Sequence, residues 1–301
     1  MVRFSKEFED VCVKKFEPDS KIGLLASVAP DGYPHLALIT SLGVKNKNTL
    51  MWGQFSRGLS KTYLADNPKT GFLVVSADQY WWTGKALHSG SVVKGEDFEY
   101  FNNKPLFRYN SYCGFGAVHY GEIEEVSAGE KLPLPRIILG SLKSALLKRT
   151  AAKHSPHSNG PVEKIPPYGL KLCSNLACLK FVAWVDTGGF PRIIPALQGL
   201  PLDTENLVFS ATPYGELLKT IPPEAKAAVF LVNLDLESLL LQGRWIPLNN
   251  RGSFRGGVFA VDKVYNSMLP LNRYIYPPEV VEPYRWSPAG EGQFPPSASS
   301  L

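Results

Sequence analysis

The chain has 301 residues, which is enough for about two domains of ordinary size. Its hydrophobic share of 44% and charged share of 20% exclude a disordered chain, and its 26 glycines and 25 prolines favour short strands and many turns. No stretch approaches the roughly 20 apolar residues of a membrane span, the charged N-terminal stretch has no apolar signal core, and four cysteines are too few for a disulfide framework. We therefore expect a cytoplasmic protein without a membrane partner.

The net charge of +5 is concentrated in one segment. Residues 131–180 hold nine Lys or Arg and one acid, so this segment carries +8 and the rest of the chain carries −3. The protein is thus a slightly acidic body with one basic segment, and nucleic acid is not expected as a partner.

The N-terminal part of the chain predicts one helix followed by strands. Apolar residues at helical spacing, with Ser5 as the cap, predict a helix over 5–15: Phe8, Val11, Cys12 and Phe16. Two apolar runs around Pro30-Asp31-Gly32 predict a hairpin. The runs LMWG at 50–53 and GFLVVS at 71–76 predict two further strands, separated by a short helix that ends before Pro68.

The same order of elements recurs after residue 170. Four landmarks of the first part have counterparts at an offset of 157 or 158: Gly32-Tyr33-Pro34 matches Gly189-Phe190-Pro191, 50–53 matches 207–210, Lys61-Thr62 matches Lys219-Thr220, and 72–75 matches 229–232. Closing strands are predicted at 116–126 and 257–264. A nearly constant offset predicts two copies of one mostly-β domain.

A basic helix is predicted between the copies, over 136–152, with its leucine side formed by Ile138, Leu142, Leu146 and Leu147. We expect this side to dock on the β domains with the lysines facing outward, while contact with an acidic partner or nucleic acid is the alternative. Residues 153–167 form a linker rich in Ser, His, Pro and Gly. The tail after Pro270 is expected to be extended on the surface or partly disordered.

The stretch Ser56-Arg57-Gly58-Leu59-Ser60-Lys61-Thr62 has two cations and three hydroxyls between a strand end and a helix start. A helix N-terminus offers free N–H groups and the positive end of its dipole, so this stretch is typical of a phosphate-binding site. A solvated loop before a Ser-capped helix with surface cations is the alternative interpretation.

Several of these segments together resemble a known family. The hairpin LLASVAPDGYPHLALI, the strand LMWGQ, the turn with Ser and Lys, Asn67-Pro68, the strand GFLVVS, the stretch ending in Gly90 and the strand GFGAVHYGEIEEV are similar to the pyridoxamine 5′-phosphate oxidase-like, FMN-binding split-barrel proteins. The resemblance covers most of 15–127 and, more weakly, 175–268. It implies a mostly β fold class, with two tandem split β-barrel (Greek-key) domains that form a pseudo-dimer and bind FMN at their interface.

The resemblance also implies site residues. Ser60 and Lys61 are the nearest matches to the cluster that grips the FMN phosphate, although the interval from Lys61 to Pro68 is one residue shorter than the family pattern. The full set of implied cofactor-binding residues is Thr40, Ser41, Ser56, Arg57, Ser60, Lys61 and Thr62. In the second copy Leu218 replaces Ser60, and Glu216 places a negative charge beside the expected phosphate. We therefore predict a working phosphate site in the first copy and a degenerate second copy.

Other residues with chemical potential have ordinary explanations. His154, His157, Cys173 and Cys178 do not have convincing metal-ligand spacing, so we expect no metal site. His35 and His119 lie on predicted strands with apolar neighbours and are expected to be structural. The aromatic run 80–82 (Tyr-Trp-Trp) is compatible either with stacking on a flavin or with capping the barrel.

The sequence thus predicts an FMN-binding, flavin-dependent oxidoreductase with a small-molecule substrate or electron donor, and it assigns no catalytic residue. The expected domains are 1–130 (FMN-binding barrel), 131–170 (basic helix and linker), 171–270 (degenerate barrel) and 271–301 (Pro-rich tail). The alternatives are a deazaflavin- or haem-binding redox protein on the same barrel, or a non-catalytic flavin-binding, stress-sensing or nucleic-acid-binding barrel. A pseudo-dimer alone and a true homodimer both remain open.

Overall fold

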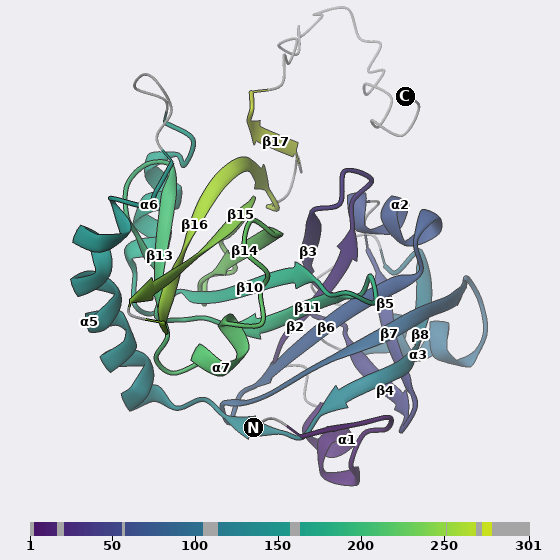
Figure 1. Ribbon diagram of the computed structural model, residues 1–301. Coiled ribbons are helices and arrows are strands. Elements are labelled where there is room, and N and C mark those ends of the chain that lie inside the picture. The colour runs from purple at the N-terminus through teal and green to yellow at the C-terminus, as the bar shows by residue number, and fades with distance from the viewer. Residues whose placement is uncertain are drawn as a thin grey trace, which may run out of the picture.

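The computed structural model describes residues 3–16, 21–55, 58–104, 114–156, 163–250, 252–268 and 273–278, and it is mostly β (Figure 1). The strands of the first part are β1 Phe4–Ser5, β2 Lys21–Val28, β3 Pro34–Leu38, β4 Gly43–Asn46, β5 Thr49–Gln54, β6 Lys69–Ser76, β7 Tyr80–Val92, β8 Ala117–Ser127 and β9 Glu130–Lys131. Those of the second part are β10 Leu179–Val185, β11 Pro191–Pro195, β12 Leu200–Pro201, β13 Asn206–Ser210, β14 Lys226–Val232, β15 Ser238–Asn250, β16 Ser253–Asn266 and β17 Arg273–Tyr276. The helices are α1 Asp10–Phe16, α2 Leu59–Asp66, α3 Glu96–Asn103, α5 Leu134–Ala151, α6 Pro167–Ser174 and α7 Gly215–Leu218.

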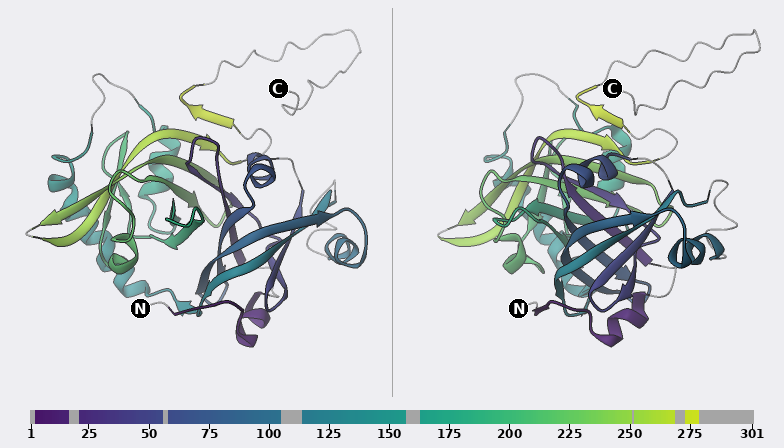
Figure 2. Two further views of the ribbon diagram at one scale, coloured as in Figure 1. Left: turned by 45° about the vertical axis from the view of Figure 1, so that its right-hand side comes forward. Right: turned by 90° about the vertical axis from the view of Figure 1, so that its right-hand side faces the viewer.

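The two sheets have the same antiparallel topology. The first follows the order β3-β2-β6-β7-β8-β5-β4 and the second the order β11-β10-β14-β15-β16-β13-β12, so each strand of one copy has a counterpart at the same place in the other. In both sheets the late strand, β8 or β16, returns to pair with an early one, β5 or β13. The predicted repeat of a mostly-β, split-barrel domain is confirmed (Figure 2).

The first hairpin of each copy turns at a glycine with a positive φ angle. Gly32 has a φ of 83° and Gly189 a φ of 78°, a region that side-chain-bearing residues rarely adopt. The turn N–H groups are bonded alike, with Gly32 N–H donating to Ala29 and Gly189 N–H donating to Asp186. Matching local chemistry therefore gives matching strand pairs on either side.

The copies pack against each other reciprocally, through the second strand of the first hairpin in each copy, β3 and β11. β3 of the first copy lies against β10, β14 and β15 of the second, while β11 of the second lies against β2, β6 and β7 of the first. A Cβ atom at Gly71 would lie only 2.2 Å from the carbonyl oxygen of Pro191, so the two backbones are in direct contact there. On the other side, Gln242 Nε2 donates to the Pro34 carbonyl over 2.9 Å.

One hydrophobic core extends across this contact. Buried side chains of the first copy, including Leu24, Leu36 and Leu73, belong to the same cluster as Phe181 and Val229 of the second. A separate core fills the first barrel beneath α1. Since burial of apolar surface is the main stabilising contribution, the two copies are expected to depend on each other for stability.

The N-terminal segment differs from the prediction. Ser5 does not cap a helix but lies in β1, which pairs with the closing strand β8, and the helix begins only at Asp10. Pairing with a sheet edge therefore overrides the local helical spacing. Phe8 and Phe16 are buried as their spacing predicts, whereas the side chains of Val11 and Cys12 lie outside the described residues.

Helix α5 docks with the opposite face from the one predicted. Ile138, Leu142 and Leu146 are 60%, 61% and 80% exposed, so three of the four predicted residues do not pack on the barrels. The fourth, Leu147, is half-buried against the second barrel. The buried side of the helix is instead made mostly of small residues: Ile137, Gly140, Ser141, Ser144 and Ala151. A Cβ atom at Gly140 would lie 2.1 Å from the Thr212 carbonyl oxygen, and only a face of small residues can approach so closely.

The predicted linker and tail lie partly outside the described residues. The structure describes 153–156 and 163–167 of the linker, and α6 begins at the end of that segment. Of the tail, residues 273–278 are described, and Arg273–Tyr276 form β17 against β16. None of the helices in the described ranges is long and apolar enough to cross a bilayer.

His35 is a buried histidine at the contact between the copies. It lies on β3, is 3% exposed, and its ring meets Tyr63 of α2 and Tyr265 of the second copy edge-on at 5.4 and 5.0 Å between ring centroids. Its Nδ1 has no hydrogen-bond partner among the described residues. Burial lowers the pKa of this imidazole from 6.5 to about 4, since the charged form would lose its hydration.

This pKa predicts a loss of stability in acid. Between about pH 6.5 and 4 the unfolded chain binds a proton at His35 that the folded chain does not. The free energy of unfolding therefore decreases as the pH is lowered through this range, by up to about 3 kcal/mol. Urea unfolding at several pH values measures this slope. His35→Phe should make the slope smaller without abolishing it, because His119 also has a lowered pKa, while His154→Gln, at an exposed histidine, should leave it unchanged. Identical slopes for the wild type and His35→Phe would contradict the assignment.

The shared core predicts the behaviour of the chain after cleavage between the copies. A protease site inserted between Pro156 and Glu163 should allow a single cut, and the two fragments should still elute together from a gel-filtration column under native conditions, because separation would expose the common core. Elution of two separate fragments would show that the copies are stable independently.

Candidate functional site

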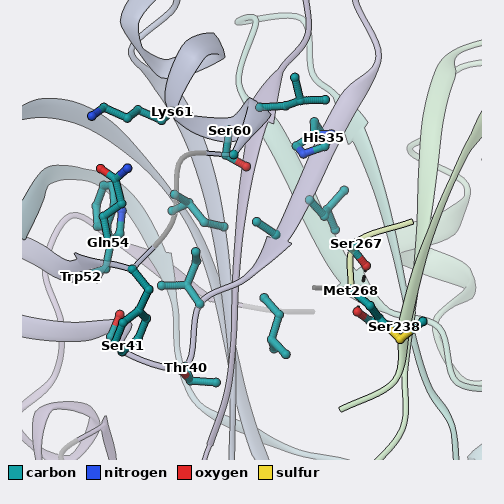
Figure 3. Close-up of a pocket in the computed structure, with 18 of the residues that line it drawn as sticks. His35, Thr40, Ser41, Trp52, Gln54, Ser60, Lys61, Ser238, Ser267 and Met268 are labelled. Carbon is teal, nitrogen blue, oxygen red and sulfur yellow. Dashed lines mark hydrogen bonds between the residues drawn. The ribbon is translucent and has the colours of Figure 1, made fainter. Parts of the chain in front are cut away.

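A cavity of about 490 Å³ lies between the two copies, within the usual size of a small-molecule site. In the first copy its walls come mainly from β3 with the turn after it, the end of β5, and α2, with Leu25 of β2 and His119 of β8. Two segments of the second copy close it, 235–238 between β14 and β15 and 265–268 at the end of β16. Figure 3 shows Lys61, Gln54 and Trp52 on one side, facing Ser238 and Ser267 on the other.

The start of α2 forms the cationic end of this cavity. Gly58 is the N-cap residue and has no side chain to cap the helix, while the Lys61 N–H donates to the Gly58 carbonyl over 3.1 Å. Gly58, Ser60 and Lys61 all line the cavity. Lys61 is the one lysine among the described residues that line the cavity, and its ammonium adds to the positive end of the helix dipole. This end is therefore suited to an anion.

The turn after β3 contributes Thr40 and Ser41, which lie just beyond the strand rather than on it. Ser41 is buried, and its Oγ donates to the Gly53 carbonyl over 2.9 Å while accepting the Gly53 N–H over 3.0 Å. These two hydrogen bonds to Gly53 of β5 hold the turn against the strand end. The Ser41 hydroxyl hydrogen is thus committed to the protein, whereas Thr40 is half-buried at the cavity wall.

The structure brings together four of the seven residues implied by the sequence resemblance: Thr40, Ser41, Ser60 and Lys61. Thr62 lies on α2 but is exposed and is not among the residues that line the cavity. Ser56 and Arg57 lie outside the described residues.

A pair of histidines lies behind the cavity wall. His119 of β8 lines the cavity, its Nε2 is 2.8 Å from Gln54 Oε1, and its Nδ1 is 3.0 Å from Nε2 of His88 on β7. The ring of His119 stacks on Trp52 at 5.6 Å. Burial, with smaller contributions from His88 and the positive charge of Lys61, lowers the pKa of His119 to about 4. His119 is therefore neutral near pH 7, when it can both donate and accept a hydrogen bond.

The sequence suggested neither the His88–His119 pair nor the wall from the second copy. His119 was expected to be structural; it is buried on a strand, but it also contacts the cavity. The second wall includes Ser238 and Ser267, whose hydroxyls lie 2.8 Å apart. Local patterns do not reveal this wall, because it comes from segments about 200 residues distant in the chain that only the packing of the copies brings to the site.

The corresponding helix start in the second copy is less suited to an anion. Lys219 pairs with Glu216 on the four-residue helix α7, so its charge is neutralised locally, and Leu218 is fully buried where the first copy has Ser60. Helix α5 covers the adjacent strand end: Ser144 Oγ accepts the Ser210 N–H over 2.9 Å, and Ser210 Oγ donates to the Gly140 carbonyl over 2.8 Å. The strand end beyond β13 is thus covered, while a second cavity of about 420 Å³ lies beside α7, lined by Leu217, Arg192 of β11 and Lys85 of β7.

Of the remaining candidates, His35 also lines the cavity. Trp81 and Trp82 are each 1% exposed and pack in the cores, and neither they nor Tyr80 lines the cavity, so none of the three is placed to stack on a ligand there. Cys173 and Cys178 are free, buried thiols. Within the described ranges no group of three or more His, Cys, Asp or Glu side chains is placed to hold a metal ion, and His157 lies outside them.

Neither a protein-family model nor a curated protein matches the sequence. Solved structures do match, each over about two fifths of this chain. HupZ of Group A Streptococcus is 14% identical, with 42% of this chain and 98% of that one covered and a TM-score of 0.34. An FMN-binding protein from Syntrophomonas wolfei is 16% identical, with 40% and 86% covered and a TM-score of 0.33.

A third match is a putative pyridoxamine 5′-phosphate oxidase from Lactobacillus delbrueckii, which is 16% identical, with 41% of this chain and 96% of that one covered and a TM-score of 0.32. Each match covers nearly all of a protein that is about one copy long. The repeated strand order of the two sheets shows that the chain carries the split-barrel fold twice.

Proposed function

We propose that this protein binds FMN in the cavity between its copies and acts as a flavin-dependent oxidoreductase on a small-molecule substrate. In this proposal residues 1–130 form the cofactor-binding domain, 131–170 the helix and linker, 171–270 a degenerate barrel that completes the site, and 271–301 a tail. The observation that carries the proposal is the cavity itself, which has a cationic helix start at one end and apolar walls beyond it.

The cationic end fits a phosphate. A phosphate monoester carries roughly −1.5 to −2 charges at neutral pH and needs hydrogen-bond donors when it leaves water. Lys61, the Ser60 hydroxyl and the uncapped N–H groups at the start of α2 supply both charge and donors. We propose that Arg57 and Ser56 extend this group from the preceding segment, and that Thr62 supports it from the helix.

The rest of the cavity fits a flat, largely apolar ring system. Leu36, Leu38 and Ile39 of the first copy line it with Trp52, and their side chains provide apolar contact. Thr40 is the polar side chain at this part of the wall. Ser41 acts indirectly in this proposal, because its hydroxyl fixes the turn against Gly53 and so shapes the wall.

A bound flavin would supply the electron-transfer chemistry, and the protein would bind, orient and shield it. Gln54 and neutral His119 place hydrogen-bonding groups beside the ring-binding part of the cavity. Segments 235–238 and 265–268 of the second copy limit the space left for a substrate. A deazaflavin would satisfy the same walls.

Lys61 and Lys219 form a matched pair of variants within one chain. Loss of one charge-assisted bond of about 1.5–3 kcal/mol means that Lys61→Ala should weaken FMN binding by roughly 10- to 150-fold. Lys219→Ala should have little effect, because Glu216 already neutralises Lys219 and α5 covers the neighbouring strand end. Quenching of FMN fluorescence on titration with each variant measures the difference.

Equal losses in the two variants would mean two working sites and would contradict a degenerate second copy. An unchanged affinity in a folded Lys61→Ala protein would move the phosphate to Arg57. The absorption spectrum of the purified protein tests the cofactor class directly: flavin bands support the proposal, whereas a Soret band or a colourless protein without affinity for FMN would overturn it.

A further inference from the structure

Helix α5 presents its apolar side to solvent. Five large aliphatic side chains are between 41% and 80% exposed along one side of the helix: Leu134, Ile138, Leu139, Leu142 and Leu146. We call these five residues the leucine stripe. The helix has 18 residues, about 27 Å at 1.5 Å per residue, and it lies along the outer edge of the second copy (Figure 1).

This orientation reverses the usual rule, in which an amphipathic helix buries its apolar side against the core. The reversal is fixed by the docked side, because Gly140 is in contact with the Thr212 carbonyl and Ser144 is bonded to Ser210. Rotation of the helix to bury the leucine stripe would put leucine side chains where Gly140 now allows backbone contact. A contiguous exposed apolar surface of this kind usually marks an interaction site.

The chain segment that carries the stripe has only positive charges. No acidic residue occurs between Glu130 and Glu163, while six Lys or Arg do. Arg136, Arg149 and Lys153 are exposed, and Arg149 follows Leu146 by one turn of the helix, at the end of the stripe. A partner that covers the leucines must therefore also tolerate, and would be attracted by, several cations.

We propose that α5 is an interfacial helix that attaches this protein reversibly to an anionic lipid surface. In this arrangement the helix lies in the plane of the membrane, with the leucine stripe among the acyl-chain ends of the headgroup region and the cations on phosphate groups. An exposed apolar stripe flanked by Lys and Arg has the composition of such helices. The attachment is peripheral and does not require a membrane-spanning segment, and it refines the expectation of no membrane partner.

The other occupants agree less well with the surface. A second copy packed stripe to stripe would bring the two sets of cations together, which is unfavourable without acidic residues to pair them. A nucleic acid would neutralise the cations but would leave the leucines without apolar contacts, since its backbone is charged. A lipid surface satisfies both parts of the stripe at once.

Sedimentation with lipid vesicles tests this proposal and does not depend on the cofactor. The wild type should bind vesicles of phosphatidylcholine with phosphatidylglycerol, bind vesicles of phosphatidylcholine alone at least about tenfold more weakly, and dissociate as salt is raised. Leu146→Glu places a charge within the stripe and should weaken binding by about tenfold or more.

Leu234→Glu is the matched control, since Leu234 is 81% exposed, as Leu146 is at 80%, but lies in the turn between β14 and β15. It should bind vesicles like the wild type. Both variants should keep the wild-type melting temperature, because neither side chain is buried. FMN titration of the same proteins should be unaffected by Leu146→Glu, so failure of this proposal and failure of the proposed function are distinguishable.

Four results would overturn the attachment to lipid. The first is absence of binding to anionic vesicles at low salt, and the second is equal loss of binding in Leu146→Glu and Leu234→Glu. The third is a wild-type dimer in sedimentation equilibrium that Leu146→Glu converts to a monomer, which would assign the stripe to self-association. Binding of duplex DNA without binding of vesicles would assign the cations to nucleic acid and would also reject the proposal.

Discussion

The close approach of β3 and β11 to the opposite copies is the constraint on which the rest of the structure depends. At Gly71 there is no space for even one methyl group, because the Pro191 carbonyl occupies it. Thr83 Oγ1 donates to the Ile193 carbonyl over 2.6 Å, and Gln242 bonds to the Pro34 carbonyl across the same contact. Because a side chain of each copy donates to a backbone carbonyl of the other, the two copies are held at a fixed distance. That distance determines the width of the cavity, whose two walls belong to different copies.

The same topology supports two different environments at equivalent places. In the first copy the strand end beyond β5 faces the cavity, and in the second the strand end beyond β13 is covered by α5. The difference comes from the segment between the copies, since α5 follows β9 directly and reaches the second barrel before the first strand of that barrel begins. A helix at this point in the chain thus covers one of two equivalent strand ends without altering the strand order.

The sequence predicted what depends on local chemistry and on repetition. Gly32 and Gly189 locate both hairpins, and the constant offset identifies the two copies, because turns and strand spacing are set by neighbouring residues. The orientation of α5 was predicted wrongly, since periodicity shows which residues share a face but not which face packs, and Gly140 decides that through a contact with Thr212. The second-copy wall of the cavity was missed for a related reason: it depends on packing between distant segments.

The histidine pair follows the same asymmetry. Strand pairing places His119 opposite Trp52 in the first copy and Gly257 opposite Phe209 in the second, so Gly257 occupies the equivalent position. The space that His119 would fill is taken there by Trp245, whose ring is 2.2 Å from the place of a Cβ atom at Gly257. Burying two imidazoles removes more hydration than burying one indole. The lowered pKa of His119 reflects this loss of hydration. The copy with the polar interior is the one with the open cavity, and the copy whose strand end is covered has an apolar side chain in that place. The polar pair is therefore connected with the cavity rather than with the stability of the barrel.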